Sequence, residues 1–159
     1  PMFGPGKSPY EPLTFVLALQ GDGDGERAQV ETLLRHPYTR VIALPFDHHD
    51  RLMGWLLGLA HLSGMLFGVA LTRSGLAPEE LHECASTTFR RQAATALSVL
   101  SEDPDLYLDI QRLNPHRDEV YDAVRAALAD LVDAIAGEDR ERFRATMAAA
   151  RRAVAPERA

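Results

Sequence analysis

The sequence is poor in the residues that define several classes of protein. It has one cysteine, Cys84, among 159 residues, so no disulfide can form within the chain and a reducing compartment is expected. Its 17 lysine and arginine residues are outnumbered by 23 aspartate and glutamate residues, which gives a formal net charge of -6. Because phosphate recognition needs a concentrated excess of positive charge, we expect no nucleic-acid partner. No basic segment precedes an apolar one near Pro1, so we expect no signal peptide and a cytoplasmic protein.

What the sequence does contain is typical of a folded domain. Hydrophobic residues make up 46% and charged residues 25% of the chain, as in ordinary soluble globular proteins. A chain of this length predicts one full domain, or one helical domain with part of another. It opens on Pro1 and soon enters a strand-like run, which favours an internal piece of a longer protein.

The first part of the chain alternates strand, helix and strand signals. Residues 13–19 (LTFVLAL) are apolar and end at GDGDG, which predicts a strand buried on both faces. A helix is predicted over 26–35 and a second strand over 40–46. This order is typical of the edge of an α/β sheet. GDGDG lacks the G-x-G-x-x-G dinucleotide fingerprint and predicts a short surface turn instead.

From Asp47 onward every segment carries a helical signal. Asp47 is a candidate N-cap, and Pro78 suits the first turn of a short helix. A helix over 87–101 is expected to end before Asp103-Pro104, and the next helix to start at Pro104. Two amphipathic helices follow, separated at Gly137. Their apolar positions are Val120, Val124, Leu128, Leu131 and Ile135, then Phe143, Met147 and Val154. The predicted fold is mainly α: an all-helical domain over 47–159, preceded by a β-α-β unit over 1–46.

Residues 52–71 (LMGWLLGLAHLSGMLFGVAL) carry no formal charge and are long enough to span a bilayer. The other interpretation is a helix buried within a helical dimer, and we favour it because the amphipathic helices need an apolar partner. A homodimer would then be implied, since one copy would expose too much apolar surface. Glycines that recur along this stretch would let neighbouring backbones approach closely, as they also do in membrane dimers. They are Gly54, Gly58, Gly64 and Gly68.

Six residues suggest a zinc-site hypothesis, because imidazole and thiolate are usual zinc ligands. They are His48, His49, Asp50, His61, His82 and Cys84. On a continuous α-helix, twelve residues at about 100° each would place His49 and His61 about 120° apart, so the two do not form a chelating pair and we expect no metal site. A lone histidine such as His61 in an apolar helix is ordinarily a core residue that hydrogen-bonds a neighbour.

Residues 86–91 (STTFRR) predict a helix that begins with hydroxyl groups, Thr87 and Thr88 among them, and carries Arg90 in its first turn. Free backbone N–H groups, the helix dipole and a guanidinium could together hold a carboxylate. The alternative is an ordinary Ser/Thr cap with two surface arginines, and the residues alone favour it. A solvated surface is likewise favoured over an anion site for the arginine-rich last helix. Those arginines are Arg140, Arg142, Arg144, Arg151 and Arg152.

Four motifs, in order, make the chain similar to one enzyme family. Residues 1–5 (PMFGP) resemble the HPMFGP motif of prephenate dehydrogenases. His49-Asp50, with His61 twelve residues later, resembles the HD motif and the helix histidine of that family. Phe89-Arg90 followed by residues 102–110 (EDPDLYLDI) resembles its aromatic-Arg and DP-x-LY-x-DI pattern. The spacing is closest to the bifunctional chorismate mutase/prephenate dehydrogenase type, and the resemblance covers nearly the whole chain.

The resemblance implies oxidative decarboxylation of prephenate to 4-hydroxyphenylpyruvate with NAD or NADP, in tyrosine biosynthesis, by a homodimer. It implies that Arg90, beside Thr87 and Thr88, anchors a carboxylate of this dicarboxylate, and that His61 and His49 lie near the substrate. The family's catalytic histidine would precede Pro1, so this chain alone is expected to be inactive. Arogenate dehydrogenase and a non-enzymatic helical dimerisation or regulatory module are the alternatives.

Overall fold

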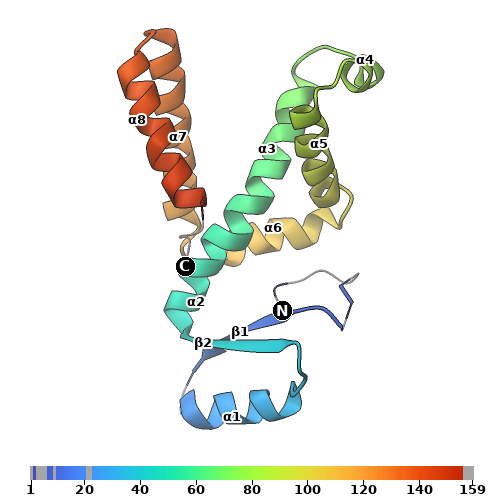
Figure 1. Ribbon diagram of the computed structural model, residues 1–159, viewed down its shortest axis with the longest axis vertical. Helices are drawn as coiled ribbons and strands as arrows, with labels where there is room; N and C mark the ends of the chain where they lie inside the picture. Colours follow the sequence, from blue (N-terminus) through green and yellow to red (C-terminus); the bar gives the residue numbers. More distant parts are fainter. Residues whose placement is uncertain (1, 3–6, 9, 21–22, 156–159) are drawn as a thin grey trace. The chain divides into compact units, whose positions relative to one another are not determined.

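The computed structural model describes residues 2, 7–8, 10–20 and 23–155. They form two compact units, Pro1–Arg117 and Asp118–Ala159. In the described residues, the first unit contains a strand pair and the helices α1 to α6, of which α2 and α3 are joined by a π-helical segment into one long helix. The second unit is a helical hairpin (Figure 1). The predicted PMFGP motif lies outside the described residues except for Met2, whose backbone N–H donates to the carbonyl oxygen of Thr14 (2.9 Å).

The N-terminal strand, helix and strand are present in the predicted order. They are β1 (Leu13–Leu19), α1 (Gly23–Leu33) and β2 (Thr39–Pro45). The strands are parallel, with Leu13 opposite Thr39 and Leu19 opposite Pro45. The predicted surface turn at GDGDG is contradicted at its last three residues, which already belong to α1, and its first two residues lie outside the described ones. Asp24 and Glu26 lie in the first turn of that helix, where carboxylates interact favourably with the free N–H groups.

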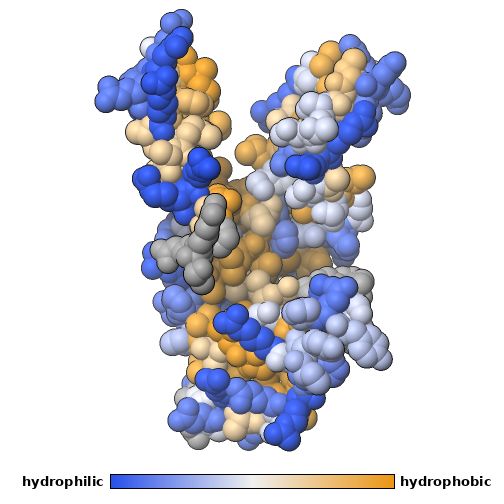
Figure 2. Space-filling model, viewed as in Figure 1, coloured by the Kyte–Doolittle hydropathy of each residue, from blue (hydrophilic) through white to orange (hydrophobic). Residues whose placement is uncertain are grey.

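Full burial of β1 on both faces was also a wrong prediction. All seven residues of β1 are only half-buried, because in this unit the sheet consists of two strands, β1 and β2. Apolar side chains therefore reach the surface beside α1 and the strands, in the lower part of the space-filling view (Figure 2).

One continuous helical segment leads from the strands into the helical part of the unit. It consists of α2 (Phe46–Met53), the π-helical segment η1 (Gly54–Leu59) and α3 (Ala60–Thr72). The predicted N-cap was wrong: the helix begins at Phe46 after Pro45, with no side-chain cap. Asp47 therefore lies in the first turn, and its carboxylate contacts His116 instead (2.9 Å). The π-helical segment had no counterpart in the sequence-based prediction.

Three further helices complete the first unit, and their predicted starts at Pro78, Thr87 and Pro104 are confirmed. They are α4 (Pro78–Glu83), α5 (Thr87–Leu100) and α6 (Pro104–Leu113). Ser86 caps α5 by accepting a hydrogen bond from Phe89 N, and Asp103 caps α6 by accepting one from Asp105 N. Helix α5 packs against α3 so closely that a Cβ added at Gly64 would lie 3.3 Å from Val99 Cγ2. The predicted close approach at this glycine therefore occurs within one chain.

The second unit is built from the two predicted amphipathic helices, α7 (Arg117–Ala136) and α8 (Arg140–Val154). Val120 and Ala134 are buried. The α7 apolar stripe stays partly open in this chain: Val124 and Leu131 are half-buried, and Leu128 and Ile135 are 55% and 63% exposed. The turn between the helices places Glu138 in the left-handed region (φ 52°).

The mainly α fold with a short β-α-β start is thus confirmed. The compact units divide after Arg117, and the sequence-based boundary between residues 46 and 47 stays a prediction about domain origin. Helix Phe46–Thr72 is long and apolar enough to cross a membrane by length and composition, and 22% of its most apolar window is buried in this chain.

Candidate functional site

One face of α6 lies along the α2–η1–α3 helix and makes polar contacts with its backbone. Gln111 Nε2 donates to the carbonyl oxygen of Gly58 (2.9 Å), within the π-helical segment. Asn114 Nδ2, one turn further on, donates to the carbonyl oxygen of Asp50 (2.7 Å). Since these residues are three apart and Tyr107 precedes Gln111 by four, all three lie on the same face of the helix. The sequence-based analysis missed this contact face, although the four- and three-residue separations of Tyr107, Gln111 and Asn114 could have indicated it.

His61 is packed under the start of α6. Its ring lies edge-on to the ring of Tyr107, with a centroid distance of 4.6 Å and an interplanar angle of 78°. Burial lowers the pKa of His61 below its ordinary value of 6.5, because a desolvated imidazolium is unfavourable. Its Nδ1 atom is buried and has no hydrogen-bond partner among the described residues. The expectation of a histidine that bonds a neighbour was therefore wrong for this nitrogen.

His49 lies near the start of the same long helix and is partly buried. Its Nδ1 atom is 2.9 Å from the carboxylate of Asp50, a contact that orients the ring. The π-helical segment changes the expected angle between His49 and His61. A π turn takes up about one extra residue, so about 100° is removed from the predicted 120°, and about 20° remains. The two histidines therefore project toward nearly the same side of the helix, although no direct contact joins them.

Arg90 is at the opposite end of the α3–α5 pair. The residue is exposed, and its Nη2 atom donates to the carbonyl oxygen of His82 (3.0 Å). Its own N–H is bonded to Ser86 O, and Phe89 N is bonded to Ser86 Oγ. The N–H groups of the exposed Thr87 and Thr88 have no hydrogen-bond partner in the described part of the chain. The helix start therefore offers two free donors beside a guanidinium.

A cavity of about 420 Å³ lies beside Arg90, between α3 and α5. Apart from Arg90 and His82, its walls are apolar. They are Phe67, Gly68, Leu71, Ala93, Ala94, Ala96, Leu97 and Leu100. The rings of Phe67 and Phe89 are 5.7 Å apart, and the His82 ring lies edge-on to Phe89. A cation at the mouth of an apolar cavity is suited to a carboxylate with an apolar body. His82, considered earlier only as a metal ligand, is thus a lining residue that the sequence analysis missed.

The structure does not bring all the predicted site residues together in one chain. His61 and His49 share a side of the long helix, and Arg90, Thr87 and Thr88 share the start of α5. Phe67 lies level with Phe89, and His61 is six residues, or about 9 Å of helix, away from Phe67. Neither histidine lines the cavity beside Arg90. A ligand that touches both groups must therefore extend along the helix pair.

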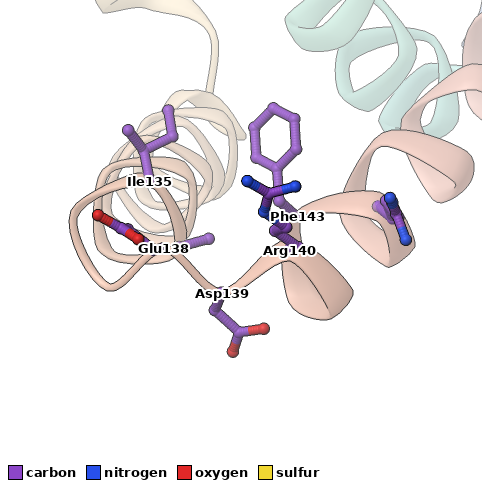
Figure 3. Close-up of a pocket in the computed structure, with 7 residues that line it drawn as sticks. Ile135, Glu138, Asp139, Arg140 and Phe143 are labelled. Carbon is purple, nitrogen blue, oxygen red and sulfur yellow. The ribbon is translucent and has the colours of Figure 1, made fainter.

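Two other proposed sites acquire less support. Among the residues that the structure describes, no three His, Cys, Asp or Glu side chains are grouped so as to hold a metal ion. In the second unit, an open pocket of about 350 Å³ lies at the α7–α8 turn. There Arg140 and Phe143 project to the same side as Ile135, while Asp139 points away (Figure 3). Arg140 and Arg144 are exposed, as expected for a solvated surface.

Comparison with known proteins now assigns the chain. Residues 45–149 match the family described as prephenate dehydrogenase, dimerization domain. A probable arogenate/prephenate dehydrogenase of Methanocaldococcus jannaschii is 27% identical over 147 residues, which is 90% of this chain and 32% of that protein. A 4-amino-4-deoxyprephenate dehydrogenase of Streptomyces pristinaespiralis is 29% identical over 149 residues, 93% of this chain and 49% of that protein. The chain spans about a third and about half of their respective lengths.

The fold and the open apolar faces define a helical assembly module that follows a parallel strand pair. The match begins at Pro45, the last residue of β2, so it covers all the helices from α2 to most of α8. The chain belongs to the prephenate dehydrogenase family and contains its dimerization domain. Both relatives are named as dehydrogenases.

Proposed function

We propose that this chain is the helical part of a cytoplasmic prephenate dehydrogenase, which oxidises and decarboxylates prephenate to 4-hydroxyphenylpyruvate with NAD or NADP. The observation that carries the proposal is the family match over residues 45–149. In the whole enzyme, a nucleotide-binding half upstream supplies the catalytic histidine and holds the dinucleotide, which accepts the hydride. The chain by itself binds and orients but does not catalyse.

The names of the relatives suggest that the site recognises the part of the substrate that the named compounds share, and not one substituent of the ring. One is named for arogenate or prephenate and the other for 4-amino-4-deoxyprephenate, and all three compounds carry carboxylates on an apolar ring. Arg90 at the mouth of an apolar cavity, beside the free N–H groups of Thr87 and Thr88, has the chemistry to bind such a carboxylate. The partly buried His61, with a free ring nitrogen, and His49 would face the polar substituents.

The open apolar faces are proposed to be covered by a second copy of the chain. Leu66 and Val69 on α3 are each 48% exposed, and Leu128 and Ile135 on α7 are more exposed still. Large exposed apolar patches mark association sites, and a closed pair related by a two-fold axis is the commonest solution. The competing interpretation is that the long helix spans a membrane. A dimer mass measured by light scattering without detergent would support the homodimer, and a chain that needs detergent to stay in solution would favour the membrane span.

Replacing Arg90 by alanine in the whole enzyme is expected to raise the KM for prephenate. Loss of one charge-assisted contact costs about 2 to 4 kcal/mol, or about 30- to 1000-fold in kcat/KM. Steady-state kinetics with prephenate, arogenate and NAD or NADP make the measurement. Arg91→Ala is the matched control, because Arg91 is the next, exposed residue of the same helix and does not line the cavity.

If the Arg90→Ala and Arg91→Ala enzymes had the same KM and kcat/KM for prephenate, Arg90 would not be the carboxylate anchor. The family assignment would not be affected. If the unmodified enzyme preferred arogenate to prephenate, its activity would be that of an arogenate dehydrogenase. An upstream sequence without a dinucleotide-binding motif, and no turnover of either compound, would leave the non-enzymatic dimer module.

A further inference from the structure

The least expected feature of the first unit is the π-helical segment Gly54–Leu59 in an otherwise α-helical run. A π turn is rare and holds one more residue than an α turn, so it interrupts the regular backbone hydrogen bonding. Such turns persist where another group supplies a compensating bond, and they occur often at functional sites. Here the compensating group comes from α6, 53 positions away in the sequence.

Gln111 is that group. It is the buried polar residue of the described chain, with 8% of its surface exposed, and its amide donates to the carbonyl oxygen of Gly58 (2.9 Å). Gly54 and Gly58 are both buried, and a Cβ added at Gly58 would lie 4.0 Å from Gln111 Oε1, so α6 lies directly against the π-helical backbone. Burying a primary amide without bonds would be costly. Gln111 and the π-helical segment thus stabilise each other.

Contacts from α6 and from the turn that follows it hold the long helix on both sides of the π turn. Before it, Asn114 donates to Asp50 O (2.7 Å), and His116 contacts Asp47 (2.9 Å). After it, the Tyr107 ring packs against the His61 ring. Helix α6 therefore spans the turn and fixes the helix on either side of it. The rotation of His61 about the helix axis, relative to His49, is determined between these anchor points.

We propose that Gln111 is a positioning residue of the enzyme: by holding the π turn at Gly58 it sets the side of the helix on which His61 is presented to the substrate. This inference rests on the proposed function of His61. If the segment became α-helical, the His61 ring would turn by about 100° relative to His49. It would leave both Tyr107 and the side of the helix that it shares with His49.

The test uses the whole enzyme with the variant Gln111→Met, which keeps the length of the side chain and removes the N–H donor. The matched control is Gln29→Met, at an exposed glutamine of α1. The first measurement is the NMR shift of the His61 ring protons, which the ring current of Tyr107 sets; it is assigned by comparison with His61→Asn. The second measurement is kcat and KM for prephenate.

We expect Gln111→Met to move the His61 signal and to raise KM about 10- to 100-fold, with a smaller change in kcat. Gln29→Met should change neither. A second variant combines Gln111→Met with deletion of Leu56, a residue 48% exposed in the π-helical segment. This deletion removes the extra residue, so an α-helix can close without the glutamine. Eleven residues at about 100° each again leave about 20° between His49 and His61, so the variant should fold and restore the wild-type His61 signal and KM.

The outcomes distinguish the positioning role of Gln111 from the proposed substrate role of His61. An unmoved His61 signal in Gln111→Met, or a displaced signal that the deletion of Leu56 does not restore, overturns the positioning role, whatever the kinetics. A moved signal with unchanged KM also overturns it, provided that His61→Asn itself raises KM. If His61→Asn keeps the wild-type KM, the proposed substrate role of His61 fails and takes this inference with it. A lower melting temperature with neither other change would reduce Gln111 to a structural residue.

Discussion

The helices of the first unit and the hairpin of the second are held together by different kinds of contact. In the first unit, α5 contacts α3 at Gly64, and α6 hydrogen-bonds to the backbone of the long helix. In the hairpin, an exposed pair joins Arg142 Nη2 to Asp130 Oδ1 (2.6 Å), and much of the apolar stripe of α7 remains open. The first arrangement fixes side chains for a site, and the second leaves a surface for a partner.

This difference teaches that helical content alone does not show which part of the chain carries the chemistry. Contacts between a side chain and a distant backbone fix one rotation of a helix, because each bond has a single geometry. Exposed ion pairs fix little, because water competes with them. The substrate contacts are therefore proposed in the first unit, and the exposed apolar residues of α7 are proposed to contact a second copy of the chain.

The largest effect is expected from Gly64→Leu. A Cβ at this position would already lie 3.3 Å from Val99 Cγ2 and 3.5 Å from Ala96 Cα, so three further carbons force α3 and α5 apart. Overpacking of this kind costs about 1 to 3 kcal/mol or more. The measurement is the urea midpoint of unfolding at a fixed protein concentration.

The matched control is Ser63→Leu, at the exposed neighbouring position, where a change within about 0.5 kcal/mol is expected. If the two variants unfolded at the same midpoint, the close α3–α5 contact would not exist in solution. The contrast between the two units would then lose its main support.

A smaller effect is expected from the pH dependence of stability at His61. Burial lowers the pKa of His61 in the folded chain below the ordinary 6.5, so the unfolded chain takes up this proton first as the pH falls. Stability is therefore complete above about pH 6.5 and is lost as the pH decreases below it. The melting temperature should fall between pH 8 and pH 5.5 by more in the wild type than in His61→Asn.

His48→Asn, at an exposed histidine of α2, serves as the comparison. It should retain the full wild-type pH dependence. A pH dependence that His61→Asn does not reduce would place the imidazole in water and contradict its packing under Tyr107.

The smallest effect is expected in the hairpin, from the Arg142–Asp130 pair. With side chains 44% and 60% exposed, a double-mutant cycle with Arg142→Ala and Asp130→Ala should give a coupling of about 0.2 to 1 kcal/mol. Raising the salt concentration should decrease it. Arg144→Ala, on the same helix, should show no coupling to Asp130. A coupling of several kcal/mol would mean that the hairpin, too, is held by a buried network.

Much of the fold was predictable because its signals are local. Proline at the first helical position placed the starts of α4 and α6 correctly, and the hydroxyl residues at 86–88 placed that of α5, since such signals act within their own turn. The run 13–19 also gave the bounds of β1. The errors came where a neighbour replaced a local rule: Pro45 precedes the first helix without a side-chain cap, and Asp47 bonds His116 instead.

The candidate site was predictable in its residue types but not in its geometry. Resemblance pointed to Arg90 and His61, and a helix start beside Arg90 was expected from the hydroxyl residues at 86–88. The distance between these two groups, the unpartnered nitrogen of His61 and the role of Gln111 were not foreseen. A fixed angle of about 100° per residue holds only for an unbroken α-helix, so the predicted angle between His49 and His61 failed at the π turn.

The sequence by itself determined the order of the elements, most of their bounds, the acidic balance of charge and the family. These depend on residues a few positions apart, whose steric and hydrogen-bonding preferences act in any context. Only the tertiary structure decided how the long helix is wound and which way His61 faces. Those features depend on hydrogen bonds between residues 53 and 64 positions apart, and they exist only once α6 has packed against the helix.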